Sequence, residues 1–248
     1  MISTAADVSM RLDKLLTTLA LGSRSHVRGL VKTGRIGVNG QPVRTADYRV
    51  DQGDIIALDG AVLDARTVRH VMLNKPRGVL TAARDAKQPT VLDLLPPVYA
   101  SCGCMPVGRL DKDTEGLLLL TTDGTLAHML LSPKRHVWKC YQAEVEGALQ
   151  AKDIAAFERG IALSDFTALP ARLEILETDL QKSTAKVWVQ EGKFHQVRRM
   201  FAALGHPVTG LKRLSIGPLP LDASLAPGEY RDLTADEIQS LLEAVSGE

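Results

Sequence analysis

The sequence predicts an α+β protein in which a small N-terminal unit precedes a larger domain. Apolar residues recur at helical spacing in some stretches and alternate at strand spacing in others, which indicates both kinds of element. The 248 residues, 45% of them hydrophobic, are enough for a small domain followed by one of roughly 150 to 200 residues. No apolar run approaches the ~18 residues of a membrane span, and the N-terminus lacks the pattern of a secretory signal. We therefore expect a cytoplasmic protein with no membrane partner.

Two short helices are expected at the start of the first unit. Four leucines at helical spacing, preceded by Ser9 as a candidate N-cap, indicate the first helix: Leu12, Leu15, Leu16 and Leu19. The second helix follows Ser23, ends near Gly34 and buries Val27, Leu30 and Val31. Its other side carries Arg24, Arg28 and Lys32 at four-residue spacing, so that these cations form one basic stripe.

A hairpin is expected after the second helix, because Asn39-Gly40 between alternating apolar residues is the strongest short hairpin signal. We divide the chain on this basis into a flexible extension (1–9), a first domain (10–59), an irregular linker (60–69) and a second domain (70–248). Strands of the second domain are expected near Val71–Leu73, Leu117–Thr121, Tyr141–Val145, Leu173–Leu176 and Val187–Gln190. Its helices are expected near Asp153–Arg159, His195–Leu204 and Glu237–Val245, the last with a capping box of Thr234 and Glu237.

Charge is segregated along the chain, although the net charge is only +1. Between Arg11 and Arg49 eight Lys and Arg residues accompany two Asp, a local charge of +6. Residues 192–221 carry five Lys and Arg and no acid, whereas residues 222–248 carry seven acids and one Arg. The near-neutral total is therefore compatible with a basic face that binds nucleic acid.

Three segments of the first domain form a recognisable pattern: Arg11-Leu-Asp-Lys-Leu-Leu, Ser23-Arg-Ser-x-x-Arg-x-Leu-Val-x-x-Gly-Arg-Ile-x-Val-Asn-Gly and Gly53-Asp-x-Ile. In their order and spacing they resemble the S4 RNA-binding domain, an αL-type fold. A basic helix face alone is often only a solvated surface. The resemblance implies that RNA is the partner and that Arg24, Arg28, Lys32 and Arg35 contact its backbone.

Three acids alternate in the polar turn that precedes the apolar strand Leu117–Leu120. Asp111, Asp113 and Glu115 would share a face on extended backbone, which leaves open paired-carboxylate chemistry of the glycosidase kind. An ordinary polar turn before a core strand is the other interpretation, and spacing alone does not choose among the acids.

Four motifs follow one another in the second domain: Met72-Leu-Asn-Lys-Pro-Arg-Gly, Gly108-Arg-Leu-Asp-x-x-Thr-x-Gly-Leu, Lys139-Cys-Tyr and Glu191-Gly-Lys-Phe-His-Gln-Val-Arg-Arg-Met. In this order they resemble the RsuA-type pseudouridine synthases of ribosomal RNA. The resemblance covers residues 10–240, with Met10 at the family's usual start. It implies a mostly antiparallel mixed sheet with flanking helices and cofactor-free isomerisation of uridine.

The resemblance also implies roles for particular residues. Asp111 is the expected nucleophile, Tyr141 packs on the uracil, and Arg198 is the cation paired with Asp111. Helical spacing alone does not separate Arg198 from Arg199, and a core tyrosine is the alternative for Tyr141. Contacts with RNA are expected from four further cations: Arg109, Lys75, Arg77 and Arg199.

The expected substrate is 16S ribosomal RNA, free or in a small-subunit assembly intermediate, because the chain is most similar to the small-subunit branch of the family. The alternatives are a large-subunit (23S) enzyme or a non-catalytic protein of ribosome assembly. The singly placed histidines and the cysteines Cys102, Cys104 and Cys140 predict neither a metal site nor a disulfide. We expect a monomer without cofactor.

Overall fold

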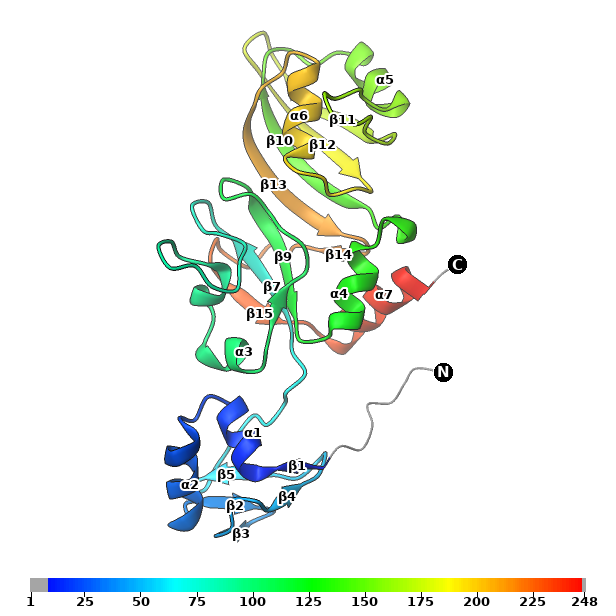
Figure 1. The fold of residues 1–248 in the computed structure, drawn as a ribbon. Coiled ribbons are helices and arrows are strands. Elements are labelled where there is room, and N and C mark those ends of the chain that lie inside the picture. The colour runs from blue at the N-terminus through cyan, green and yellow to red at the C-terminus, as the bar shows by residue number, and fades with distance from the viewer. Residues whose placement is uncertain (1–8, 247–248) are drawn as a thin grey trace. The chain divides into compact units, whose positions relative to one another are not determined.

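The computed structural model describes residues 9–246, so the expected flexible extension lies outside the described residues except for Ser9. The chain divides into two compact units (Figure 1). The first contains the described residues up to Arg69 together with residues 96–104, and the second contains residues 70–95 and 105–246.

The first unit consists of three helices and short strands. These are β1 (Met10–Arg11), α1 (Leu12–Thr18), α2 (Arg24–Lys32), β2 (Ile36–Val38), β3 (Gln41–Pro42), β4 (Arg49–Val50), β5 (Ile56–Leu58), β6 (Ala61–Val62) and α3 (Pro97–Ser101). All the apolar residues assigned to the two expected helix faces are buried in one core. The helical spacing of the leucines therefore predicted this packing correctly.

One of the two expected N-caps is confirmed and the other is wrong. The hydroxyl of Ser23 accepts a hydrogen bond from the amide of His26 at 3.3 Å and begins α2. Helix α1 instead begins after Arg11, without a side-chain cap. Met10–Arg11 is extended because it pairs with Arg49–Val50 of β4, which leaves Ser9 outside the helix.

The hairpin expected at Asn39-Gly40 is confirmed. Both residues have left-handed backbone, with φ of 52° and 78°, and they join β2 to β3. Strand β5 pairs with β2 on the other side, and β6 pairs with β5. Regular structure thus extends into residues 60–69, which the sequence assigned to an irregular linker.

Helix α3 belongs to the first unit, although the sequence placed its residues in the second domain. It contacts α1 through a hydrogen bond from the Ser101 hydroxyl to the Thr17 carbonyl at 3.0 Å.

Within the described residues, the second unit contains a sheet of nine strands. Its strands are β7 (His70–Lys75), β8 (Met105–Pro106), β9 (Glu115–Thr121), β10 (Lys139–Glu146), β11 (Arg172–Thr178), β12 (Lys182–Val189), β13 (Val208–Ile216), β14 (Leu219–Pro220) and β15 (Tyr230–Asp232). The order is β11-β12-β10-β13-β9-β7-β15, with β14 on β13 and β8 on β9. Only β13 and β9 pair in parallel among these described strands. The expected α+β fold with a mostly antiparallel sheet is confirmed.

Strand β13 was not predicted from the sequence, yet it joins the two halves of the sheet. Lys212 and Arg213 lie beside Glu115 and Gly116 of β9. Gly116 has a φ of 98°, and a β-carbon there would overlap the carbonyl oxygen of Arg213. Glycine at this position therefore permits the close approach of the two backbones.

Helices pack on both halves of this sheet. They are α4 (Gly124–Leu131), α5 (Ala151–Arg159), α6 (Gln196–Ala203) and α7 (Ala235–Ser246), with short 3₁₀ helices at Val91–Leu94 and Pro133–Arg135. Helices α4 and α7 lie side by side (Figure 1) and bury Leu126 and Leu241 in one core. Helices α5 and α6 contact each other through Phe157 and Phe201, whose ring centroids are 4.8 Å apart. Val197, Met200 and Phe201 of α6 are buried as expected, whereas Leu204 is half-buried.

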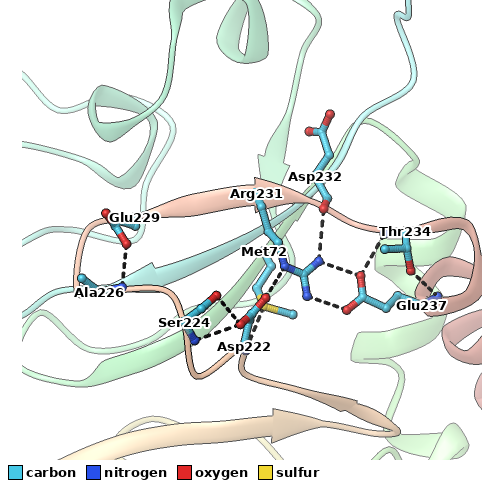
Figure 2. A network of polar contacts seen from close by, with 9 residues as sticks. All are labelled: Met72, Asp222, Ser224, Ala226, Glu229, Arg231, Asp232, Thr234 and Glu237. Carbon is cyan, nitrogen blue, oxygen red and sulfur yellow. Dashed lines mark hydrogen bonds and ion pairs between the residues drawn. The ribbon is translucent and has the colours of Figure 1, made fainter.

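Arg231 ties the end of the chain to the sheet (Figure 2). Its Nε donates to Asp222 at 2.6 Å, and its two terminal nitrogens donate to Glu237 at 2.8 and 2.7 Å. Glu237 also accepts from the Thr234 amide, and the Thr234 hydroxyl accepts from the Glu237 amide, so the expected capping box is confirmed. The Arg231 guanidinium holds the pKa of Glu237 below its ordinary value.

Residues 9–246 include no helix with both the length and the apolar character needed to cross a bilayer.

Replacing Arg231 with methionine should lower the free energy of unfolding by about 1 to 2 kcal/mol, because the change breaks charge-assisted hydrogen bonds in a partly exposed network. Lys152→Met removes an exposed cation on α5, and it should cost less than about 0.5 kcal/mol. Urea unfolding measures both. Because the pKa of Glu237 is lower in the folded protein than in the unfolded chain, its ionised carboxylate stabilises the fold at pH values above the unfolded pKa. The loss of unfolding free energy in Arg231→Met should therefore shrink below about pH 4, where the carboxylate takes up a proton. Equal losses in the two variants would contradict this role.

Candidate active site

The turn that carries Asp111 is held in place by Thr81, a buried residue of the irregular segment that follows β7. The hydroxyl of Thr81 donates to the carbonyl of Leu110 at 2.7 Å and accepts from the Leu110 amide at 3.2 Å. Leu110 itself is buried. The amide of Thr114 donates to the Asp111 carbonyl at 3.0 Å, which closes the turn. The backbone on both sides of Asp111 is thus fixed, and its side chain is 32% exposed.

Lys75 is buried beneath this turn and does not line an RNA path, which corrects the expectation from the sequence. It is 0% exposed, and its ammonium donates to the carbonyls of Pro76, Lys112 and Thr114 at 3.0, 3.1 and 3.0 Å. Burial lowers the pKa of Lys75 to about 8, and the three neighbouring acids of the turn oppose that shift. The Lys75 ammonium donates its hydrogen bonds to backbone carbonyls, so this residue positions the turn.

Two nitrogen-bearing side chains lie against the Asp111 carboxylate. Arg198 Nε is 3.9 Å from Oδ2, and His195 Nε2 is 3.5 Å from Oδ1. Arg198 is itself oriented by bonds to the carbonyls of Val208 at 3.2 Å and Asp113 at 3.3 Å. The expected pairing of Arg198 with Asp111 is therefore present in the geometry.

Arg199 takes a different direction from Arg198. Its guanidinium pairs with Asp165, donates to the Ser164 hydroxyl at 3.2 Å and lies over the ring of Phe166. Helical spacing left the two arginines equivalent, whereas the structure places only Arg198 beside Asp111 among this pair. The RNA contact expected of Arg199 stays a prediction.

His195 was missed as a site residue because the sequence analysis assigned it to the start of a helix. It has left-handed backbone with a φ of 49° and lies just before α6. That conformation is uncommon for a residue other than glycine. With this backbone, the imidazole ring reaches the Asp111 carboxylate. The only signal in the sequence was a polar residue three positions before Arg198.

Tyr141 lies on β10 and lines the same pocket as Asp111. Its side chain is 8% exposed, and the guanidinium of Arg213 lies 6.0 Å from its ring centroid. The pocket is also lined by Arg109, whose side chain is exposed, and by Arg198. Four of the residues expected at the site are thus brought together from three separate segments: the turn with Arg109 and Asp111, strand β10 with Tyr141, and helix α6 with Arg198.

Further cations lie buried behind Tyr141. The ammonium of Lys139 donates to the carbonyls of Val137 at 3.0 Å and Gln190 at 3.4 Å. Burial, with a smaller contribution from Arg213, lowers the pKa of Lys139 to about 8. Among the described residues, Arg213 Nη2 and Thr114 Oγ1 are buried polar atoms without a hydrogen-bond partner. This region carries polar groups that a core designed only for stability would not retain.

The remaining expected RNA-binding residues are exposed cations. Arg77 pairs with Glu115 at 3.4 Å in the second unit. In the first unit, Arg24, Arg28 and Lys32 share the exposed side of α2, as expected. Arg28 pairs with Asp13 at 3.4 Å, and Arg35 pairs with Asp59. Within residues 9–246, no group of three or more His, Cys, Asp or Glu side chains has the arrangement of a metal site.

Comparison with known families finds two matches. The RNA pseudouridylate synthase family matches residues 69–203, and the S4 domain matches residues 10–56. Both segments contain the motifs on which the resemblance was based.

Full-length relatives and a solved structure agree with these matches. An RNA pseudouridine synthase of Bacillus subtilis is 44% identical, with 94% of this chain and 99% of the relative covered. Ribosomal small subunit pseudouridine synthase A of Escherichia coli is 38% identical, with 94% of this chain and 100% of the relative covered. The crystal structure of a pseudouridylate synthase superposes with a TM-score of 0.65 at 36% identity, covering 94% of this chain and 100% of that one.

Replacing Lys75 with methionine should lower the free energy of unfolding by about 3 kcal/mol, because three buried or partly buried carbonyls lose their charged donor. Lys112→Met is the matched control, since Lys112 belongs to the same turn but is exposed and donates to Gln88. The control should unfold within about 0.5 kcal/mol of the original protein. Urea unfolding at neutral pH tests both, and a loss no larger than that of the control would show that Lys75 does not hold the turn.

The lowered pKa of Lys75 also predicts how the free energy of unfolding of the same two variants changes with pH. Between pH 8 and 10.5 the unfolded chain still binds the Lys75 proton, whereas the folded chain has released it. The contribution of Lys75 to stability therefore rises with pH across this window. Lys75→Met should lack that rise, so its deficit against the original protein should grow from pH 8 to 10.5.

Proposed function

Because the chain belongs to the RNA pseudouridylate synthase family, we propose that it isomerises a uridine of ribosomal RNA to pseudouridine with Asp111 as the nucleophile. One observation carries the assignment of the site: the Asp111 carboxylate, Arg198 and Tyr141 line one pocket although they come from separate parts of the chain. Asp113 and Glu115 share the turn but do not line that pocket. The alternation of the three acids therefore does not support a paired-carboxylate mechanism.

The reaction exchanges one bond of the uracil for another. The bond from ribose C1′ to uracil N1 breaks, the base turns, and C1′ is joined to C5, while the proton of C5 is lost and N1 gains a proton. Neither an oxidant nor a reductant is consumed. A carboxylate at position 111 supplies the nucleophile for a covalent intermediate, by attack on the ribose or on the base.

The surroundings of Asp111 suit this role. Arg198 and His195 stabilise the negative charge of the carboxylate when a bound base displaces water from it. Tyr141 offers an aromatic surface to the uracil and, through its hydroxyl, a group for proton transfer at C5. The fixed backbone of the turn keeps the attacking oxygen in place before substrate arrives.

The first unit is proposed to deliver the RNA. Arg24, Lys32 and Arg28 on α2, together with Arg35, present cations at a spacing that suits phosphate contacts. We propose residues 10–59 as the RNA-binding domain and residues 70–248 as the catalytic domain of a cytoplasmic monomer. Relatives named for the small ribosomal subunit favour 16S ribosomal RNA, free or in an assembly intermediate, as substrate.

Deleting the gene should remove one pseudouridine from 16S ribosomal RNA, and mapping both ribosomal RNAs at nucleotide resolution tests this. A plasmid copy should restore the modification, whereas Asp111→Asn should fail by at least about a thousandfold in rate because the amide is a poor nucleophile. Asp113→Asn, a matched control in the same turn, should restore it. Loss of a 23S modification instead would overturn the 16S assignment, and a fully active Asp111→Asn would overturn the nucleophile.

RNA affinity should fall steeply with salt, and the double variant Arg24→Ala, Lys32→Ala should reduce the slope of log affinity against log salt by about 1 to 2. Each phosphate contact contributes roughly 0.7 to 0.9 to that slope. Lys152→Ala removes one exposed cation on α5 of the second unit and should leave the slope unchanged. Filter binding at several salt concentrations measures this, and identical slopes in all proteins would place the phosphate contacts elsewhere.

A further inference from the structure

An exposed aromatic side chain adjoins the candidate active site without belonging to its core. Phe194 is 75% exposed, although it follows Lys193 and precedes His195, both of which line the pocket. Single exposed apolar residues are common on protein surfaces, so exposure alone carries no conclusion. What distinguishes Phe194 is its packing against the residue that touches the nucleophile.

Phe194 and His195 form a stacked pair of rings. Their centroids are 3.8 Å apart and their planes differ by 16°. The other end of this arrangement is Asp111, whose Oδ1 lies 3.5 Å from His195 Nε2. A single ring thus separates the exposed phenyl group from the carboxylate that reacts with the uridine.

The loop that carries the two rings is anchored rather than loose. Gln196 is 5% exposed, and its side chain accepts from the Lys193 amide at 3.1 Å and donates to Glu191 at 3.0 Å. Glu191 in turn accepts from the amide of Leu169 at 2.9 Å. These bonds fix the backbone on both sides of Phe194, so the ring is presented in a defined place.

Cations and a second aromatic ring lie in the same region of the chain as the stacked pair. Lys193, which lines the pocket with His195, has its ammonium 3.7 Å from the centroid of Phe166, and Arg199 lies over the same ring at 5.2 Å. Arg109, which is exposed, lines the pocket as well. Aromatic faces interleaved with Lys and Arg are the arrangement that binds single-stranded nucleic acid through base stacking and phosphate contacts.

We propose that the Phe194–His195 pair is a stacking subsite for the nucleobase that flanks the target uridine. This inference rests on the proposed function. A uridine that enters the pocket leaves its neighbour in the RNA without a stacking partner, which costs free energy. The exposed face of Phe194, one ring away from Asp111, replaces that lost partner for a base of any identity.

The test compares four variants in single-substrate kinetics on the ribosomal RNA transcript that the original protein modifies. Phe194→Ala and Phe194→Leu should each raise KM about tenfold, the usual loss for one stacked base, with kcat changed less than about twofold. Phe194→Trp should stay within about twofold of the original KM. Leu180→Ala removes the 93% exposed side chain at the tip between β11 and β12 and should change neither constant.

Two further readouts separate stacking from other roles. Phe194→Ala should leave the salt slope of RNA binding unchanged, because stacking releases no counterions. Its urea unfolding should match that of Leu180→Ala. A KM for Phe194→Ala equal to that of Leu180→Ala, or a Phe194→Leu as active as Phe194→Trp, would overturn the subsite. An original protein that forms no pseudouridine in either ribosomal RNA would instead overturn the proposed function.

Discussion

The arrangement of the site depends on the approach of two backbones at Gly116. Strand β9 belongs to one half of the sheet and β13 to the other, and they pair in parallel over Gly116 and Arg213. A side chain at position 116 would overlap β13, so the two halves meet there only because this residue is glycine. The turn before β9 carries Asp111, while Tyr141 lies on β10 beside β13 and Arg198 lies on α6. The constraint at Gly116 therefore brings residues of both half-sheets to one pocket.

Two buried lysines, Lys75 and Lys139, hold the backbone around the pocket. Moving an ammonium out of water is costly unless its donors are satisfied, and Lys75 has three carbonyl partners for its three N–H groups. Its pKa of about 8 shows that burial still outweighs the three acids nearby, although the group stays charged at neutral pH. Lys139 has two carbonyl partners, lies near Arg213 and has a similarly lowered pKa. Two buried ammonium groups near the pocket are thus held by backbone carbonyls rather than by acidic side chains.

Local patterns predicted most of the fold, whereas long-range packing decided the parts that were missed. Ser23 and Asn39-Gly40 act through neighbouring backbone, so their roles were visible in sequence. Strand β13 was overlooked because its sequence, with Lys212 and Arg213 at its centre, lacks the apolar run of an interior strand. Lys75 was taken for a surface cation because nothing local reveals that two of its three carbonyl partners, those of Lys112 and Thr114, come from a turn almost forty residues away. His195 was missed for the same reason, since its partner Asp111 is distant in the chain.

The cations of the first unit show how RNA affinity can coexist with a nearly neutral chain. Arg28 and Arg35 are paired with Asp13 and Asp59, so each guanidinium is held in place before RNA binds. Asp13 is buried, and the guanidinium of Arg11, with a smaller contribution from Arg28, lowers its pKa. Exposed ion pairs contribute little stability, because water and salt screen them. This screening applies to the Arg35–Asp59 pair, in which both side chains are about half exposed, and not to the buried carboxylate of Asp13. A phosphate at Arg35, as proposed above, would therefore compete with the Asp59 carboxylate at a small loss of free energy and would meet an arginine whose side-chain entropy is already reduced.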